Sequence, residues 1–261
     1  MTDPSPESIV RVEIDGPAAR VVLADPARRN ALSLAMFDGL ERALDRLQAA
    51  SVVAASLEAE GPAFCAGFDL AAAAERAETL VEFVRRLGAL VRSIRRMETV
   101  LLAAVQGPAL AGGAAIVFAC DLMVVTPEAR LGYPAVRLGI SPAVSLPTLL
   151  PAVGGGEARR LLLSGELVNG REAMKRGFAA GISENPESLR KLAAELVRRI
   201  ASSGPQAVRA TKRWCGEDEG TDEDSLFEVT TRATESLALE AECRTRMIEA
   251  LAARRSKDRD R

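Results

Sequence analysis

Two short glycine-bearing segments carry the chemistry that this sequence suggests. They are residues 64–70 (FCAGFDL) and residues 106–115 (QGPALAGGAA). Glycine lets the backbone turn sharply and approach a ligand closely, so each segment can present a peptide N–H to one point. Two such donors form an oxyanion hole, which stabilises the negative oxygen that develops on a carbonyl during acyl chemistry. We therefore expect the two segments to meet at one site.

The absence of one residue type limits the chemistry further. The 261 residues include no histidine. This excludes Ser-His-Asp and Cys-His nucleophilic catalysis, and it excludes histidine-ligated metal sites. Acid–base work must fall to Asp, Glu, Tyr, Cys, Lys or solvent. We expect no metal and no tightly bound cofactor.

Composition indicates a globular protein with a large core. Hydrophobic residues make up 48% of the chain, charged residues 27%, and the net charge is −2, which argues against a nucleic-acid surface. The four cysteines lack metal-site or disulfide spacing, and residues 1–8 lack the pattern of a signal peptide. We therefore expect a cytoplasmic protein.

One apolar stretch has the length of a membrane span. Residues 99–120 contain no charged side chain. However, the Gln106-Gly107-Pro108 and Gly112-Gly113 sequences interrupt the stretch, which favours two short buried elements joined by a turn. We expect no membrane association.

The elements that must position these segments follow from periodicity. Alternation predicts a hairpin of strands at 10–14 and 19–23, and Ser33 is placed to cap a helix that ends near Gln48. Further predicted elements are strands at 51–57, 100–105 and 121–125, and helices at 75–97 and 113–119.

The second half is predicted to be mostly helical. A strand–helix–strand–loop–helix–strand pattern of about 45 residues recurs before it, by spacing rather than by sequence identity. Helices are expected at 146–150, 156–163, 170–176, 187–201, 205–214 and 224–253, with an acidic connector at 216–224. We expect a core at 1–200 and a helical region at 201–261.

The order of five motifs resembles the crotonase superfamily, also called the enoyl-CoA hydratase/isomerase family. Each motif is weak alone, but all five occur in order and at the family's spacing over roughly residues 10–255. They are residues 29–33 (RNALS), 64–70, 106–113, 120–121 (CD) and 138–140 (LGI).

This resemblance implies a fold, a ligand and an assembly. The fold is α/β, a spiral of ββα turns followed by a C-terminal helical region used for trimerisation. The ligand is an acyl-CoA or acyl-carrier-protein thioester, with coenzyme A entering as part of the substrate. The assembly is a homotrimer or a dimer of trimers.

The resemblance also assigns site residues. It makes the backbone N–H groups of Phe68 and Gly112 the two oxyanion donors. Residues expected to lie along the CoA moiety are Arg28, Arg29, Ala31, Ala66, Asp69 and Leu70, with the arginines facing phosphates. Asp69 matches an acidic position that is more often structural than catalytic.

Two departures from the family pattern affect the expected reaction. Family hydratases carry two glutamates where this chain has Ala115 and Ala135. Hydration requires activation of water at one carbon and delivery of a proton to the next, and alanine does neither. Residues 141–145 (SPAVS), where other members place a carboxylate, also contain no acid.

Few side chains remain that can act. Tyr133, the only tyrosine, is a tentative catalytic residue, with simple packing beside Pro134 as the alternative. Cys65 is expected to be a packing residue. Five further side chains could enter the pocket: Glu75, Arg76, Arg137, Ser141 and Ser145. A surface or capping role is the simpler expectation for each of them.

The sequence thus predicts the ligand more firmly than the reaction. Decarboxylation fits best because it generates a thioester enolate without a base that removes a carbon-bound proton. The alternatives are residual enoyl-CoA hydratase/isomerase activity and an inactive acyl-CoA-binding protein.

Overall fold

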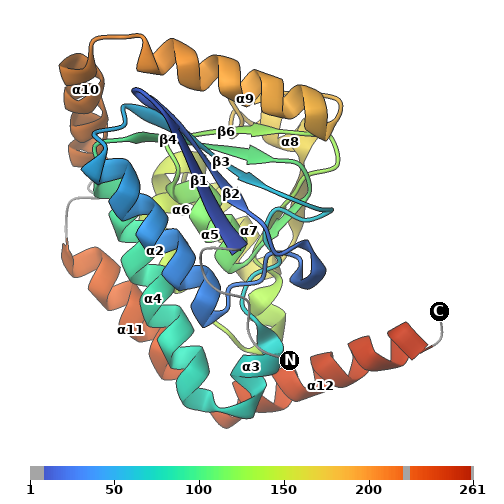
Figure 1. The fold of residues 1–261 in the computed structure, drawn as a ribbon. Coiled ribbons are helices and arrows are strands. Elements are labelled where there is room, and N and C mark those ends of the chain that lie inside the picture. The colour runs from blue at the N-terminus through green and yellow to red at the C-terminus, as the bar shows by residue number, and fades with distance from the viewer. Residues whose placement is uncertain (1–8, 220–223, 260–261) are drawn as a thin grey trace.

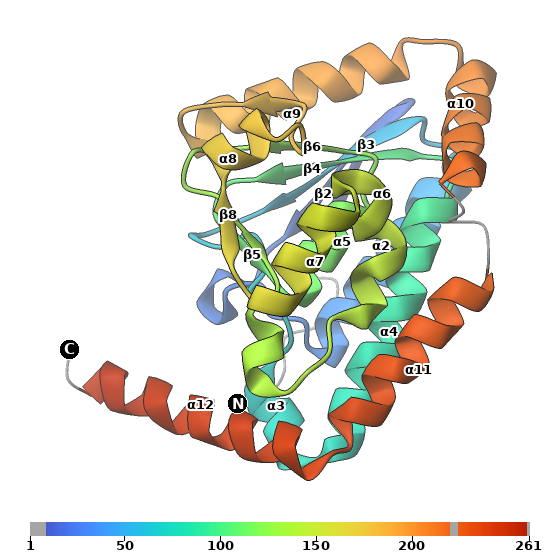
Figure 2. The same ribbon diagram turned by 180° about the vertical axis from the view of Figure 1, so that it is seen from behind.

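The computed structural model describes residues 9–219 and 224–259 (Figure 1). Residues 1–8, for which no signal peptide was expected, and part of the acidic connector lie outside this range. The described chain is a mixed α/β structure in which one large and one small sheet are surrounded by helices (Figures 1 and 2).

The main sheet has six strands in the order β1-β2-β3-β4-β6-β9. The first two form the predicted antiparallel hairpin, and the remaining neighbours are parallel. The strands are β1 (Val10–Asp15), β2 (Ala18–Leu23), β3 (Ala54–Ala59), β4 (Val100–Val105), β6 (Leu122–Val125) and β9 (Gly181–Ile182).

A second, three-stranded sheet stands beside it in the order β5 (Pro108–Leu110), β7 (Arg130–Gly132) and β8 (Leu167–Asn169). From β4 to β7 successive strands alternate between the two sheets, which produces the predicted spiral. Isolated parallel bridges, Cys65 with Ala109 and Leu32 with Phe68, place the first glycine-bearing segment along β5.

The central strand β4 is apolar throughout because helices cover both faces of the main sheet. Leu101, Ala103 and Val105 belong to the same core as residues of α2, α4 and α5, whereas Val100, Leu102 and Ala104 belong to a second core shared with α9. Figure 1 shows α9 on one side of the sheet and α2 and α4 on the other. The helices of the first half are α2 (Leu34–Ala49), α3 (Leu70–Glu75), α4 (Ala77–Arg96) and α5 (Gly112–Ala119).

The predicted start of α2 is confirmed in detail. The side chain of Ser33 accepts a hydrogen bond from the N–H of Met36 at 3.2 Å, which satisfies one free donor of the first turn. The helix predicted at 75–97 is confirmed as α4, and the short helix α3, which was not predicted, precedes it and is separated from it at Arg76, where the backbone is extended.

Helix α5 explains the long uncharged stretch. All of its residues are buried, so no polar side chain is tolerated on any face. Within the described ranges, no helix combines the length and apolar character needed to cross a bilayer.

The second half contains short 3₁₀ segments and a run of helices. The 3₁₀ segments are η1 (Pro26–Arg28) in the first half, then η2 (Pro134–Leu138) and η3 (Ala143–Ser145). The helices are α6 (Leu146–Val153), α7 (Gly155–Ser164), α8 (Gly170–Lys175), α9 (Pro186–Ala201), α10 (Pro205–Asp218), α11 (Asp224–Ala238) and α12 (Ala241–Arg259).

The single last helix predicted at 224–253 is wrong. The chain forms α11 and α12, with i→i+3 hydrogen bonds closing a turn at Leu239 and Glu240. Packing causes the break, because α11 runs beside α4 whereas α12 passes under α3 and η2 (Figures 1 and 2). The acidic connector is also shorter than predicted, since α10 continues to Asp218.

Candidate active site

The first predicted oxyanion donor lies on an extended strand-like segment. The N–H of Leu32 donates to the carbonyl of Gly67 at 2.8 Å, and the N–H of Asp69 donates to the carbonyl of Leu32 at 3.1 Å. The N–H of Phe68 therefore points away from Leu32. No carbonyl among the described residues accepts it. Gly67, with φ +88°, makes the turn that orients this peptide.

The second predicted donor is the first residue of α5. The N–H of Gly112 has no acceptor among the described residues, as expected for a first-turn donor. It also lies at the positive end of the α5 dipole. The preceding residue, Ala111, has φ +49° and ψ −110°, a conformation that alanine rarely adopts, and its N–H is anchored on the carbonyl of Gly132 at 2.9 Å.

The two donors are neighbours. A Cβ atom placed on Gly67 would lie 3.8 Å from the nitrogen of Gly112. A Cβ on Gly112 would lie 3.4 Å from Cε1 of Phe68 and only 2.7 Å from Cδ1 of Leu32. Gly112 is therefore glycine because the Phe68 segment packs directly on it. The structure brings Phe68 and Gly112 together as the sequence predicts.

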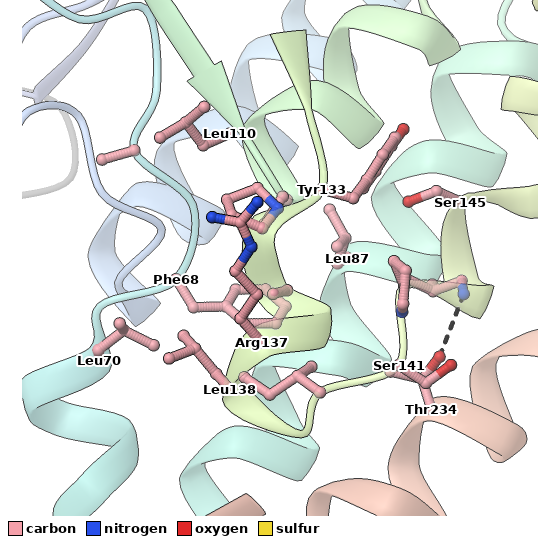
Figure 3. Close-up of a pocket in the computed structure, with 18 residues that line it drawn as sticks. Phe68, Leu70, Leu87, Leu110, Tyr133, Arg137, Leu138, Ser141, Ser145 and Thr234 are labelled. Atoms are coloured by element: carbon pink, nitrogen blue, oxygen red, sulfur yellow. Dashed lines mark hydrogen bonds between the residues drawn. The ribbon is translucent and has the colours of Figure 1, made fainter. Parts of the chain in front are cut away.

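A cavity of about 210 Å³ opens beside these donors (Figure 3). This is below the range of about 300–1,000 Å³ typical of pockets for larger ligands. Apolar residues dominate its wall. Lining residues include Ala66, Phe68, Leu70, Leu87, Leu110, Ala111, Gly112, Tyr133, Ala135, Arg137, Leu138, Ile140, Ser141, Val144, Ser145 and Thr234.

The two alanines at the family's glutamate positions differ in location. Ala135, in η2, lines the cavity, whereas Ala115 is fully buried in α5 and does not reach it. The described lining residues include no carboxylate, so no glutamate or aspartate from another segment replaces them.

Tyr133 lies in the cavity wall immediately before η2. Its ring stacks on Phe118 with centroids 6.5 Å apart, and only 1% of the residue is exposed. Its hydroxyl has no hydrogen-bond partner among the described residues, and Figure 3 shows Ser145 on the same side of the cavity. Burial raises the pKa of Tyr133, and the Ser145 hydroxyl only partly offsets this, so the phenol is neutral.

The residues predicted to lie along CoA are also brought together. The N–H of Ala66 donates to the carbonyl of Arg29 at 3.1 Å, and Ala31 directly precedes the Leu32–Phe68 bridge. Arg29 is exposed, whereas Nε of Arg28 pairs with the Asp25 carboxylate at 2.8 Å.

Two further residues of that predicted group have identifiable positions. Leu70 lines the cavity. The Asp69 carboxylate accepts hydrogen bonds from the N–H groups of Ala71 and Ala72, at 3.1 and 3.2 Å. It therefore caps α3.

A buried asparagine that the sequence interpretation missed holds this loop. The Asn30 side chain accepts from the N–H of Asp25 and donates to the carbonyls of Glu60 and Ala63, at 2.8–3.0 Å. Arg29 and Asn30 both have positive φ. Asparagine tolerates positive φ better than most residues. Its presence in this loop was the sequence feature that could have predicted the turn.

The other predicted pocket residues divide into two groups. Arg137, Ser141 and Ser145 line the cavity. Glu75 and Arg76 are exposed at the junction of α3 and α4 and do not line it, because α3 ends before it can fold over the opening. The Cys65 thiol is buried, which raises its pKa to about 12 and makes it unreactive.

Comparison with known proteins agrees with this geometry. The family model for enoyl-CoA hydratase/isomerase matches residues 13–249. A putative enoyl-CoA hydratase from Thermus thermophilus is 42% identical over 217 residues, covering 78% of this chain and 82% of that protein. Cyclohexa-1,5-dienecarbonyl-CoA hydratase from Thauera aromatica is 34% identical, covering 81% and 82%.

A solved structure shows the same architecture. The crystal structure of a putative enoyl-CoA hydratase from Mycobacterium avium paratuberculosis has a TM-score of 0.83 and 30% identity, and the match covers 94% of this chain and 96% of that one. The chain therefore belongs to the enoyl-CoA hydratase/isomerase family and has the crotonase fold.

Proposed function

We propose that this protein binds an acyl-CoA thioester and removes a carboxylate from its acyl group as CO₂. The observation that carries this proposal is the composition of the cavity: two free backbone donors stand beside an apolar wall in which the described residues supply no carboxylate base. Decarboxylation forms a thioester enolate without a base that removes a proton from carbon.

The proposed step balances without an external reagent. The electron pair of the bond between the α-carbon and its carboxylate moves into the bond between the α-carbon and the thioester carbon. The thioester oxygen takes up the negative charge, and CO₂ leaves. The N–H groups of Phe68 and Gly112 stabilise this enolate oxygen, and loss of one such donor typically costs about 10²–10³ in kcat. One proton then adds to the α-carbon.

Tyr133 is the proposed source of that proton. It lines the cavity, and its raised pKa keeps the hydroxyl protonated. A thioester enolate is a far stronger base than a phenolate, so transfer from this phenol is downhill. Ser145, which is itself buried, lies on the same side of the cavity (Figure 3).

Hydration is the second candidate, because the relative from Thermus thermophilus is called a putative enoyl-CoA hydratase. The reaction needs one group to activate water and one to deliver a proton. Because Ala115 and Ala135 stand where the family hydratases have glutamates, both of these groups are missing, and we place hydration second. Thioester binding without turnover is the third.

We also propose a homotrimer or a dimer of trimers in the cytoplasm. Exposed leucines support assembly: Leu150, Leu163 and Leu237 lie around an open surface cavity between α6, α7 and α11. Such an apolar surface is typical of an interface. The four unpaired cysteines fit a reducing compartment. Light scattering after size-exclusion chromatography measures the assembly.

The test of the reaction is a product analysis in D₂O. The purified protein is incubated with malonyl-CoA, and mass spectrometry follows the acyl-CoA product. We expect acetyl-CoA that carries one deuterium at the α-carbon, together with CO₂. Unchanged malonyl-CoA alongside measurable thioester binding would favour the inactive acyl-CoA-binding protein instead.

A further inference from the structure

The acyl cavity contains a cation that the reaction above does not use. Arg137, in the last turn of η2, is the only charged side chain among the described lining residues. Figure 3 shows its guanidinium within the ring of lining side chains, on the side of Phe68 and Leu110. Arg137 is exposed, so its guanidinium keeps contact with solvent while it lines the cavity.

Arg137 has no carboxylate partner among the described residues. Some arginines elsewhere in the fold are paired with carboxylates, such as Arg86 with Asp38 and Glu41, and Arg160 with Glu157 and Glu166. The guanidinium of Arg137 is instead available to an anion that the described part of this chain does not supply.

The fold fixes the path of the Arg137 side chain. Gly165, after α7, has φ +64°, and a Cβ atom placed on it would lie 3.2 Å from Nε of Arg137. Glycine at this position leaves room for the guanidinium to lie against the backbone and still reach the cavity.

The remaining polar groups in the cavity are hydroxyls with hydrogens to donate. Ser141 Oγ accepts from the N–H of Ala143 at 3.3 Å, and its own hydrogen remains available. The buried Tyr133 hydroxyl also has no hydrogen-bond partner among the described residues, and the Ser145 hydroxyl lies on the same side of the cavity (Figure 3). Thr234 is different, because it accepts from Val144 N–H and donates to the Thr230 carbonyl.

We propose that this cavity selects acyl groups that carry a carboxylate, and that Arg137 is the residue that recognises it. A guanidinium and free hydroxyls are donors, and an ionised carboxylate is an acceptor-only group that pairs with guanidinium through two hydrogen bonds. The inference rests on the proposed function, which makes the ligand an acyl-CoA thioester.

The recognised carboxylate is charged in the ground state, and it loses its charge if it leaves as CO₂. Arg137 therefore stabilises the bound substrate more than the transition state, so it contributes to binding rather than to the chemical step. Replacing Arg137 by leucine should raise KM for a carboxylated substrate and leave kcat unchanged or higher.

The test compares two four-carbon thioesters that differ in the terminal group, which is a carboxylate in one and a methyl group in the other. Isothermal titration calorimetry measures Kd for succinyl-CoA and butyryl-CoA at low salt. We expect the wild-type protein to bind succinyl-CoA about tenfold more tightly, Arg137→Leu to lose this preference, and Arg137→Lys to keep part of it. The matched control is Arg190→Leu, because Arg190 is exposed on α9 and does not line the cavity. This variant should keep the full preference for succinyl-CoA.

Either of two results overturns the inference: equal Kd values in the wild-type protein, or a preference that survives in a folded Arg137→Leu variant. Both leave the proposed reaction open, because CO₂ release from malonyl-CoA is measured separately. If neither thioester binds, the result contradicts the proposed function itself.

Discussion

At the scale of single residues, the site is defined by what the cavity wall lacks. The backbone donors at Phe68 and Gly112 are present, and residue 135 contributes only a methyl group to the cavity wall. A family scaffold without its acid–base side chains should regain hydratase chemistry when a carboxylate is returned to that wall.

The first prediction restores that carboxylate. Ala135→Glu should hydrate crotonyl-CoA at least tenfold faster than the wild-type protein, because a positioned carboxylate contributes about 10²–10⁴ as a general base. The loss of the conjugated enoyl-thioester absorbance measures the rate. Ala135→Gln has nearly the same shape but no basic group, so equal rates in the two variants would refute the explanation.

The second prediction concerns Tyr133. Burial holds its folded-state pKa above the unfolded value of 10.0. Stability linked to the neutral phenol is therefore fully present below pH 10 and is lost as pH rises above it. Urea unfolding of the wild-type protein and Tyr133→Phe should show a constant difference from pH 8 to 9.5 and a relative loss of wild-type stability above pH 10.

The same variant tests the chemical role. Tyr133→Phe should lower CO₂ release about 10- to 100-fold while leaving thioester affinity unchanged, because only the proton donor is removed. If the variant releases CO₂ at the wild-type rate, Tyr133 is a packing residue.

At the scale of elements, two positive-φ residues aim the donors. Gly67 precedes Phe68, and Ala111 precedes Gly112, so each turn directs the following N–H toward the cavity. The strained Ala111 is held by its hydrogen bond to Gly132, which links the proposed oxyanion hole to the small sheet. Strain of this kind tends to gather at functional sites.

The third prediction tests this arrangement. Gly67→Ala places a methyl group at φ +88° and 3.0 Å from the Leu110 carbonyl, which should abolish most turnover. Gly16 also has a positive φ, +54°, but it lies in the β1–β2 turn with open space around it. Gly16→Ala should therefore lose about 1–2 kcal/mol of stability, as expected for a side chain at positive φ, but keep its activity. Chemical unfolding and CO₂ release distinguish the two, and equal activity in both would contradict the role of Gly67.

Elements with strong local signals were predictable from the sequence. The β1–β2 hairpin, the Ser33 cap and the apolar run of β4 each act through neighbours in the chain, and all three are confirmed, although the two-residue turn is Gly16-Pro17 rather than Asp15-Gly16. The meeting of residues 64–70 with 106–115 was predicted through the motifs. The approach of Arg137 and Thr234 to the same cavity depends on distant packing, and only Arg137 was anticipated.

Other elements were not predictable because they have too few residues to show a period. Strands β5, β7 and β8 have three residues each and β9 has two. The break between α11 and α12 has no proline or glycine to mark it, since tertiary contacts with α4 and α3 impose it. The boundary near residue 200 stays a prediction.

At the scale of the whole molecule, a buried ion pair connects α10 to the main sheet. Nζ of Lys212 donates to Asp121 at 2.8 Å and to the carbonyls of Thr99 and Ile94, at 2.7 and 3.3 Å. Asp121 in turn accepts from the N–H of Leu101 on β4. Burial lowers the pKa of Lys212, and Asp121 opposes this shift.

The fourth prediction follows from this pair. Lys212→Met should destabilise the protein by about 3 kcal/mol, because it leaves a partly buried carboxylate without its closest cation. Chemical unfolding measures the loss. Lys191→Met, which breaks an exposed pair with Glu187 on α9, is the control and should change stability little. Arg95 also lies 3.9 Å from the Asp121 carboxylate. Similar small losses of stability in both variants would show that Arg95 alone is enough to balance the charge of Asp121.

The central claim is that the backbone half of the active site holds a thioester while the side-chain half no longer supports hydration. The most direct measurement compares kcat/KM of the wild-type protein for methylmalonyl-CoA and for crotonyl-CoA under one set of conditions. We predict CO₂ release from methylmalonyl-CoA with propionyl-CoA as product, and crotonyl-CoA hydration at least 100-fold less efficient. Rapid hydration of crotonyl-CoA, with methylmalonyl-CoA left intact, would contradict the account.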